Sequence, residues 1–576
     1  MKTIWFDREE PLTLFRKRIQ GFLAGYRQNL SLLGEPGMGK TALLRRLQRE
    51  FPATEQMVLI YAEIKENEPF REWARRFVQS FLYGSLQTRM EGSLPASWTE
   101  ILESSRRFFP KTATGAQKII ELSEGSRWET MAGLIWDLPA LFHEETGCRV
   151  VLLIDEFHRL SRMPFKQPFR LLGQRVMVQN STLFLLSSSE LYEARAILRE
   201  GLALLFGQFE VVELKPLSAE SCRKALRELT PGTEFHPLTE RLLIDLAQGH
   251  PSRLYFLMEA LRRIPGLIVS QNPDACMIDL LEAVFLDPQA VLSAQYEERL
   301  SSIPECPERP LCFELLQAVS EGKQKISQLA QTVHKPMQIV LRALGMLEQS
   351  GLLAHQGVFY FIPERLFALW MRTAYPVSHG LGLAGSEQAQ LYFRDRVWRW
   401  LLQMREVADQ PLGAWAARLL RQWNGERLEI EGRVHRLPRF GSVDPVPFVS
   451  ATALHARSGG VQKDWIVIAC PGSLDETAAR RLIQRIRSHA EWKTAHKLVL
   501  GPHPVDLNAR LMLQEAKIKL WDLSVFDSLC DWYGLPRWAA PVAAEFSSGS
   551  VRSVSEISAN RPVTGDLFGA DEGRTG

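Results

Sequence analysis

The sequence predicts an α/β fold: a parallel sheet covered by helices, then a helical region, then a second, smaller α/β domain. In residues 1–260, short apolar runs alternate with stretches of helical periodicity, which is the pattern of a mostly parallel sheet. A Gly-rich turn follows the first apolar run, at 30–33, and leads into a helix. Apolar residues make up 45% and charged residues 23% of the chain, which excludes a protein that is disordered over most of its length.

The length, net charge and cysteine content of the chain limit the kinds of protein that it can be. At about 150 residues per domain, 576 residues predict three or four domains. The 69 Lys and Arg against 66 Asp and Glu leave a net charge of +3, which excludes a polybasic protein that coats nucleic acid. No apolar run approaches the roughly 20 residues that span a bilayer, so we expect no membrane partner. Seven scattered cysteines without a C-x-x-C pair argue against a disulfide framework and favour the cytoplasm.

Residues 1–215 are predicted to form the core of the first domain, and residues 216–264 a helical lid on it. The predicted strands are the apolar runs at 30–33, 56–61, 149–154 and 182–187, with an edge strand at 211–214. The predicted helices between them lie at 42–51, 72–83 and 126–146. Strands that are separated by helices imply a sheet with both faces covered.

The turn after the first strand carries the motif G-x-x-x-x-G-K-T, as Gly34-Glu-Pro-Gly-Met-Gly-Lys-Thr41. Between a predicted strand and a predicted helix, this spacing indicates a P-loop NTPase. The glycines let backbone N–H groups turn toward phosphate oxygens, and the helix points the positive end of its dipole at them. Lys40 is placed to reach the β- and γ-phosphates, and Thr41 to bind Mg²⁺. We therefore expect ATP and Mg²⁺ as cofactors, with nucleotide contacts from Gly34, Glu35, Pro36, Gly37, Met38, Gly39, Lys40, Thr41 and Ala42.

Two adjacent acids end the apolar strand near residue 154. Asp155 is a predicted Mg²⁺ ligand, together with Thr41, and Glu156 is predicted to orient and deprotonate the attacking water. Taken alone, such a pair is often only a solvated turn. Beside a P-loop the metal site is favoured, because charge at the end of a buried strand is costly without a cation. The predicted catalytic residues are Glu156 and Lys40.

Residues 265–378 are predicted to be a helical connector followed by a winged helix-turn-helix. Two helices separated by a turn, the second at 337–349, precede two short strands within 351–362. One interpretation places the second helix in a DNA major groove, with Lys335 and Arg342 on phosphates. Two cations neutralise few phosphates and give weak affinity for DNA. The alternative interpretation is that the winged helix serves as a structural arm or lid.

The P-loop and the acid pair together resemble the AAA+/STAND superclass of P-loop ATPases. Within it, the chain looks most like the prokaryotic archaeal-type ATPases and next most like the origin-recognition initiators. Those proteins begin with a segment similar to Phe6-Asp-Arg-Glu9, which packs near the adenine. Gly249-His-Pro-Ser-Arg253 resembles their sensor-2 element, and this resemblance implies that Arg253 binds the nucleotide. Ser187-Ser-Ser189 stands where a sensor-1 polar residue is expected.

Residues 387–540 are predicted to be a second α/β domain, which resembles Mrr-type restriction endonucleases and the nuclease-like domain fused to archaeal-type ATPases. The resemblance rests on alternating strands and helices that end with a strand at 518–521. Active members carry an Asp on one strand and an acid with a Lys on the next. Asp444 is the candidate Asp, and the strand at 467–471 has neither an acid nor a Lys, so we expect no nuclease activity. Residues 541–576 are rich in Ser, Gly and Ala and are predicted to be disordered.

Two helices of this predicted domain, at 391–405 and 475–489, are rich in arginine. Arginines next to the tryptophans of the first helix can bind a nucleic-acid backbone and stack on bases. Equally, the tryptophans can lie in the core with the arginine stems packed over them. The residues alone leave both interpretations open.

The sequence favours an ATPase whose nucleotide cycle is coupled to double-stranded DNA or to a DNA-bound partner. The alternative is a nucleotide-gated switch or scaffold for a protein partner, with slow hydrolysis. Gln208 supports the alternative, because relatives often carry an Arg at this place in the segment Phe206-Gly-Gln-Phe209, and an arginine finger is therefore not expected there. An oligomer is compatible with the resemblance, since AAA+ proteins commonly place active sites between subunits.

Overall fold

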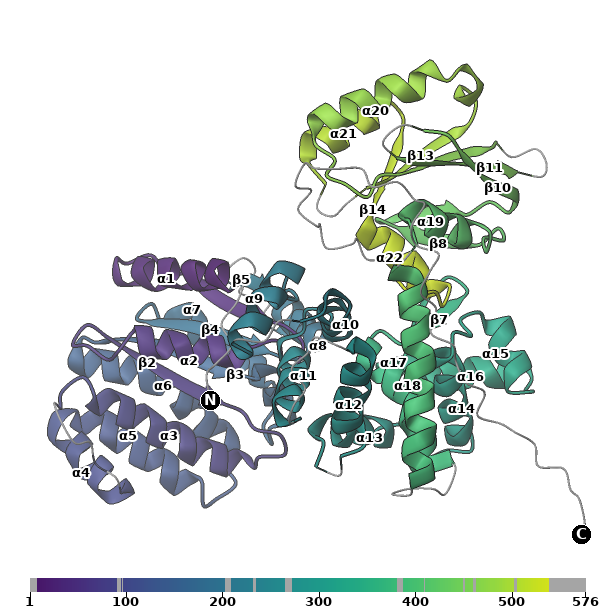
Figure 1. Cartoon of the computed structure of the whole chain (residues 1–576). Coiled ribbons are helices and arrows are strands. Elements are labelled where there is room, and N and C mark those ends of the chain that lie inside the picture. Colours follow the sequence, from purple (N-terminus) through teal and green to yellow (C-terminus); the bar gives the residue numbers. More distant parts are fainter. Residues whose placement is uncertain are drawn as a thin grey trace, which may run out of the picture.

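The computed structural model shows three regions in chain order: an N-terminal α/β domain, a helical middle region and a C-terminal α/β domain (Figure 1). Among the described residues, no helix is long and apolar enough to cross a membrane. The predictions for Phe6, for Gln208 and for the tail at 541–576 lie outside the described residues. The structure describes residues 8–90, 95, 97–201, 209–231, 235–264, 272–287, 289–380, 387–408, 410–448, 451–458, 463–501 and 505–537.

The N-terminal sheet has five parallel strands in the order β2-β3-β4-β1-β5. All four predicted strands are present, and the predicted edge strand lies at the edge of the sheet beside β1. The first four strands are buried along almost their whole length, as their continuous apolar runs predict. The strands are β1 (Asn29–Leu33), β2 (Met57–Glu63), β3 (Arg149–Asp155), β4 (Thr182–Ser188) and β5 (Phe209–Glu213).

Helices cover both faces of this sheet. On one face lie α1 (Glu9–Leu23) and α2 (Lys40–Glu50), and on the other α3 and its neighbours (Figure 1). Two helices, α4 and α5, were not predicted, because their buried faces consist largely of Ser, Thr and Ala and give little apolar periodicity. The second layer comprises α3 (Phe70–Leu86), α4 (Trp98–Phe108), α5 (Pro110–Leu122), α6 (Trp128–Thr146) and α7 (Pro168–Val178).

The lid helices and the middle region share one hydrophobic core. The predicted succession of helices and a two-stranded hairpin is present between 309 and 373. The elements are α9 (Ala219–Leu229), α10 (Pro237–Ala247), α11 (Pro251–Arg263), α12 (Pro273–Phe285), α13 (Val291–Ser301), α14 (Arg309–Ser320), α15 (Ile326–Thr332), α16 (Met337–Gln349), β6 (Ala354–Gln356), β7 (Phe359–Phe361) and α17 (Arg365–Thr373).

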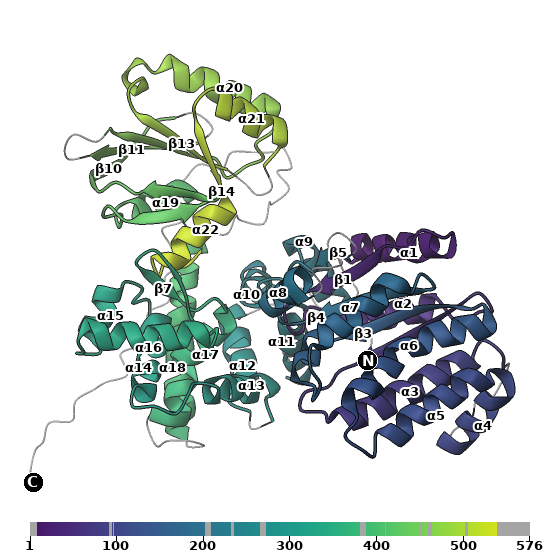
Figure 2. The ribbon, with the colours of Figure 1, turned by 180° about the vertical axis from the view of Figure 1, so that it is seen from behind.

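Helix α18 (Glu387–Ala408) corrects the predicted start of the C-terminal domain at 387. Its buried side chains, among them Phe393 and Val397, belong to the core of the middle region. In both views this helix runs alongside the middle region and ends beside the C-terminal domain (Figure 2). The hydrophobic core of the C-terminal domain begins at Val407, near the end of α18.

The C-terminal sheet has the order β10-β11-β12-β13-β14, with antiparallel pairing in the first three strands and parallel pairing afterwards. Helices α20 and α21 cover one face, and α19 and α22 cover the other (Figure 2). Strand β11 was not predicted from the sequence. The elements are α19 (Leu412–Leu420), β8 (Arg427–Ile430), β9 (Arg433–Arg436), β10 (Phe440–Val446), β11 (Thr452–Ser458), β12 (Trp465–Ala469), α20 (Glu476–Ser488), β13 (His496–Gly501), α21 (Leu507–Glu515), β14 (Lys519–Asp522) and α22 (Leu523–Trp532).

The hairpin β6–β7 of the middle region packs against the C-terminal domain. The Gln356 side chain donates a 2.9 Å hydrogen bond to the carbonyl of Glu429. A Cβ at Gly357 would lie 2.5 Å from the carbonyl oxygen of Arg427, and Gly357 also has a φ of +61°, so only glycine fits this contact. The ring of Phe359 is 4.6 Å from that of Tyr533, centroid to centroid. The C-terminal domain therefore packs against one side of the hairpin, while Val358 at its turn is exposed.

Candidate nucleotide-binding site

The P-loop joins the end of β1 to the start of α2. Gly37 and Gly39 have φ values of +79° and +92°, a backbone conformation that glycine adopts without strain. Consecutive residues in such a turn make a concave surface of backbone N–H groups that suits an anion. Lys40 is 4% exposed, and its Nζ donates to the carbonyls of Gly34 (2.8 Å) and Glu35 (3.1 Å). Burial lowers the pKa of Lys40, and the carboxylates of Glu156 and Asp155 oppose this effect.

Asp155 lies at the end of β3 and is 1% exposed. Its Oδ2 accepts hydrogen bonds from Thr41 Oγ1 and from the Tyr61 hydroxyl, each at 2.8 Å, and its Oδ1 accepts one from Ser187. Three hydroxyl donors satisfy a carboxylate that would otherwise be costly to bury. The structure thus brings together Thr41 and Asp155, which are 114 residues apart in the sequence.

Glu156 follows directly in a left-handed backbone conformation, with φ at 57°. This turn directs its carboxylate to the end of β4, where Oε2 accepts from the backbone N–H of Ser189 (2.8 Å) and from its hydroxyl (2.7 Å). His158 Nδ1 lies 3.4 Å from the same oxygen. Burial lowers the pKa of His158, which favours the neutral imidazole. Glu156 is therefore held at the pocket by β4.

The pocket between the P-loop and the ends of β3 and β4 has a volume of about 520 Å³. Most of the predicted site residues line it, whereas Gly34, Glu35, Met38, Asp155 and Arg253 do not, and Met38 lies in the core instead. Arg159 and Arg162 also line the pocket and were not predicted, although their places four and seven residues after Asp155 were a signal for it. The lining residues are Pro36, Gly37, Gly39, Lys40, Thr41, Ala42, Glu66, Glu156, His158, Arg159, Arg162, Ser189, Glu190 and Ser252.

The lid touches the P-loop through the start of α11. His250 Nε2 is 2.9 Å from the carbonyl of Pro36, and Ser252 Oγ donates to the carbonyl of Gly37 at 2.8 Å. A Cβ at Gly37 would lie 2.3 Å from Ser252 Oγ, so the lid and the loop are in close contact. Burial, and next the nearby Arg253, lower the pKa of His250 to about 4.

Arg253 was predicted to bind the nucleotide, but the structure does not place it at the pocket. Its Nε lies 3.1 Å from Glu364 Oε1, at the residue that precedes α17. Arg299 and the hydroxyl of Tyr296 bind the same carboxylate, at 2.6 and 2.7 Å. Neighbouring residues on a helix point in different directions, so Ser252 faces the P-loop while Arg253 faces the middle region.

Most of the arginine-rich surface predicted on α18 is used in ion pairs. Its four arginines each bind at least one carboxylate of the middle region or of the same helix, and the Trp400 side chain is buried. On α20, Arg480 pairs with Glu476 one turn away, while Arg481 and Arg487 are exposed. Three arginines of α18 are therefore bound to acids of the middle region, whereas Arg399 and the arginines of α20 present basic side chains to solvent.

The candidate nuclease residue Asp444 lies on β10. Its Oδ2 accepts from Ser442 at 2.8 Å and from Arg457 at 3.4 Å. Its neighbour in the sheet is His455 of β11, rather than a residue of the strand at 467–471. No group of three or more His, Cys, Asp or Glu able to hold a metal ion occurs among the residues that the structure describes.

The chain is similar to several solved structures and to one family model. A Walker-type ATPase of Pyrococcus abyssi is similar, with 17% sequence identity and a TM-score of 0.42 over 64% of this chain and 96% of that one. The ORC2 protein of Aeropyrum pernix, solved with ADPNP and ADP, has 14% identity and a TM-score of 0.39 over 69% and 95%. The comparison with curated proteins gives no match. Residues 4–186 match the family model described as AAA ATPase domain, so the N-terminal part of the chain contains a nucleotide-binding domain of this kind.

Proposed function

We propose that the protein binds and hydrolyses Mg²⁺·ATP in the pocket between the P-loop and the ends of β3 and β4. The observation that carries the proposal is that Lys40, Thr41 and Glu156 line one pocket. Asp155 accepts a hydrogen bond from the Thr41 hydroxyl next to this pocket. A carboxylate and a hydroxyl in contact are oxygen donors of the type that Mg²⁺ prefers. Thr41 and Asp155 would hold the ion, which would supply positive charge against the charge that develops on the phosphates.

Different residues of the pocket have different roles in ATP binding and hydrolysis. The backbone of the P-loop cradles the phosphates, and Lys40 exchanges its two carbonyl partners for phosphate oxygens. Glu156 orients a water and accepts its proton, since its carboxylate already lies at the pocket on Ser189. Arg159 and Arg162 line the mouth of the pocket and add positive charge toward the phosphates.

The nucleotide cycle acts on the rest of the molecule through the lid. A change in the conformation of the P-loop alters the positions of His250 and Ser252, because both side chains contact the loop directly. The next residue, Arg253, is bound to Glu364 at the start of α17. Nucleotide binding is thereby linked to the position of the middle region.

Coupling to DNA or to a DNA-bound partner remains the first proposed output. It is supported by the order of helices and hairpin in the middle region, by the exposed residues of α16 and by the exposed arginines of α20. The basic side chains on α16 are few, and Arg342 pairs with Glu308 at 3.4 Å. DNA contact by this helix is therefore weak without help from another surface.

A nucleotide-gated switch for a protein partner is the second candidate, and one specific observation favours it. The hairpin that would contact DNA in a winged helix packs on one side against β8 and the end of α22 of the C-terminal domain. Movement of the C-terminal domain would therefore change the surroundings of the hairpin. These contacts fit a protein whose readout is domain movement.

ATP turnover by the full chain, with and without double-stranded DNA, tests the proposal. We expect turnover in the wild type, its loss in Lys40→Ala and retained ATP binding without turnover in Glu156→Gln. Glu190→Gln is the matched control, because Glu190 lines the same pocket and has no assigned role. Wild-type turnover equal to that of Lys40→Ala contradicts hydrolysis. ATP turnover that does not change when DNA is added favours the nucleotide-gated switch over coupling to DNA.

A further inference from the structure

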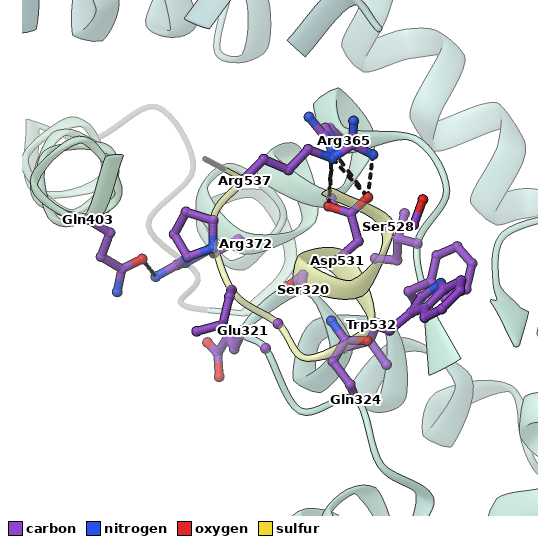
Figure 3. A pocket seen from close by; sticks show the side chains of 18 of the residues that line it. Ser320, Glu321, Gln324, Arg365, Arg372, Gln403, Ser528, Asp531, Trp532 and Arg537 are labelled. Carbon is purple, nitrogen blue, oxygen red and sulfur yellow. Dashed lines mark hydrogen bonds and ion pairs between the residues drawn. The ribbon is translucent and has the colours of Figure 1, made fainter. Parts of the chain in front are cut away.

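A second cavity, of about 560 Å³, lies where the middle region meets the C-terminal domain (Figure 3). Its walls come from the end of α14, from α17 and α18, and from α19, α22 and the segment that follows α22. Ligand sites commonly have volumes of about 300–1,000 Å³ and commonly lie between domains. The cavity is separate from the nucleotide pocket, with which it shares no lining residue.

One side of the cavity is an ion-pair cluster that is already neutralised. Arg365 Nη2 is 3.0 Å from Asp531 Oδ1, and Arg537 Nε is 3.1 Å from the same oxygen. Figure 3 shows both guanidinium groups converging on this carboxylate. Asp531 binds both arginines and Arg365 also binds Asp245 of the lid, so two acids balance two arginines, and these groups form a fixed wall of the cavity.

Arg372 lies about two turns after Arg365 on the same face of α17 and has a different set of contacts. The only hydrogen bond that its guanidinium makes to a described residue is to the neutral amide of Gln403, at 3.2 Å (Figure 3). Burial, and next the charge of Arg396, lower the pKa of Arg372, with Glu321 opposing them. Glu321 itself binds Arg396. A partly buried guanidinium with a neutral partner is stabilised by an incoming anion.

Gln324 is a second polar group of the lining, and one of its atoms is unsatisfied. Gln324 is 8% exposed, and its Oε1 has no hydrogen-bond partner among the described residues. Buried polar atoms in folded proteins are satisfied in the large majority of cases. Because this oxygen is itself buried, a rotation of the Gln324 side chain toward the cavity would let it accept from a donor on a bound molecule. The partly buried indole ring of Trp532 supplies apolar surface beside these polar groups.

We propose that this interdomain cavity binds a small molecule that carries an anionic phosphate or carboxylate group and a hydrogen-bond donor. The anion lies on Arg372, and the donor faces Gln324. Since the lining residues come from both the middle region and the C-terminal domain, the ligand holds these two parts together. The site is a sensor of a metabolite distinct from the ATP that the P-loop binds.

Binding is tested by calorimetry on the full chain carrying Lys40→Ala, which removes the phosphate site of the P-loop. Adenosine 5′-monophosphate and citrate are the probes for a phosphate and for a carboxylate, and adenosine is the neutral control. We expect saturable binding of at least one anion, none of adenosine, and about tenfold weaker binding after Arg372→Gln. Arg399→Gln is the matched control, because it removes a paired, exposed arginine of α18 outside the cavity.

Hydrogen exchange on the Lys40→Ala protein supplies a measurement that needs no substitution in the cavity. The bound probe is expected to slow exchange in peptides covering α17 and α22, and to leave α2 unchanged. Binding of AMP alone assigns a phosphate ligand, and binding of citrate alone a carboxylate. The proposal fails if neither anion binds saturably, if Arg372→Gln binds as tightly as Arg399→Gln, or if the slowed exchange is confined to the P-loop.

Discussion

Replacing Glu364 by Gln tests how firmly the lid is attached to the middle region. Glu364 is 9% exposed and accepts hydrogen bonds or ion pairs from Arg253, Arg299 and Tyr296. Glutamine preserves the shape of the side chain and one acceptor oxygen, but it removes the negative charge between two guanidinium groups. We therefore expect α11 and α17 to separate more readily in the Glu364→Gln protein.

The magnitude follows from the burial of the partners. The Arg253 side chain is 17% exposed, whereas that of Arg299 is 38% exposed, so water screens the second pair more strongly. Breaking a buried ion pair from one side costs about 3–5 kcal/mol, and the screening of Arg299 places the expected loss at the lower end, about 3 kcal/mol. A loss of this size increases the population of the open state by about a hundredfold.

Hydrogen exchange of backbone amides in α11 and α17 measures this opening. We expect exchange about a hundredfold faster there, with α3 and α5 unchanged because they lie in a separate core. Glu259→Gln is the matched control: its carboxylate lies on α11, is 34% exposed and is 3.6 Å from Arg262, a surface pair worth at most about 1 kcal/mol. Equal exchange in the two variants refutes the reasoning.

Three further outcomes are expected. The pKa of about 4 for His250 lies below the ordinary value of 6.5, so an unfolded or undocked lid binds the proton more tightly. The stability of the lid contact should therefore fall as pH drops from 6.5 toward 4, and His250→Gln should abolish this dependence in thermal unfolding. Gly37→Ala places a Cβ 2.3 Å from Ser252 Oγ at a left-handed φ, and calorimetry should show ATP binding weakened at least about tenfold. Gly357→Ala brings a Cβ to 2.5 Å from the Arg427 carbonyl, which should release the C-terminal domain and increase the radius measured by small-angle scattering, whereas Gly345→Ala on α16 should not.

Local patterns in the sequence were sufficient to predict the N-terminal sheet. Buried parallel strands are continuous apolar runs, and the P-loop is a contiguous motif, so neither depends on distant residues. The juxtaposition of Thr41 and Asp155 also followed, because the P-loop and the end of β3 have defined places in such a sheet. Strand β11 was missed because its buried residues are interrupted by polar His455 and flanked by Arg457.

The direction of Arg253 could not be predicted, since it depends on a partner 111 residues away in the chain. The motif placed the residue at the start of a helix near the P-loop, which is correct, but not on which side of the helix a carboxylate would lie. The same applies to α18. Its arginines suggested a nucleic-acid surface, and only the tertiary fold shows that Asp279, Glu282 and Asp274 neutralise two of them, Arg394 and Arg405.

Two consecutive residues at the start of α17 connect the parts of this molecule. Glu364 binds Arg253 of the lid, while Arg365 binds Asp245 of the lid and Asp531 of the C-terminal domain. A rotation of the lid that keeps these contacts moves α17, and α17 moves the C-terminal domain with it. A rotation that breaks them leaves buried charges unpaired, which is costly. The lid and the C-terminal domain are therefore expected to move together, and a ligand in the cavity beside Asp531 acts on the same joint as the nucleotide.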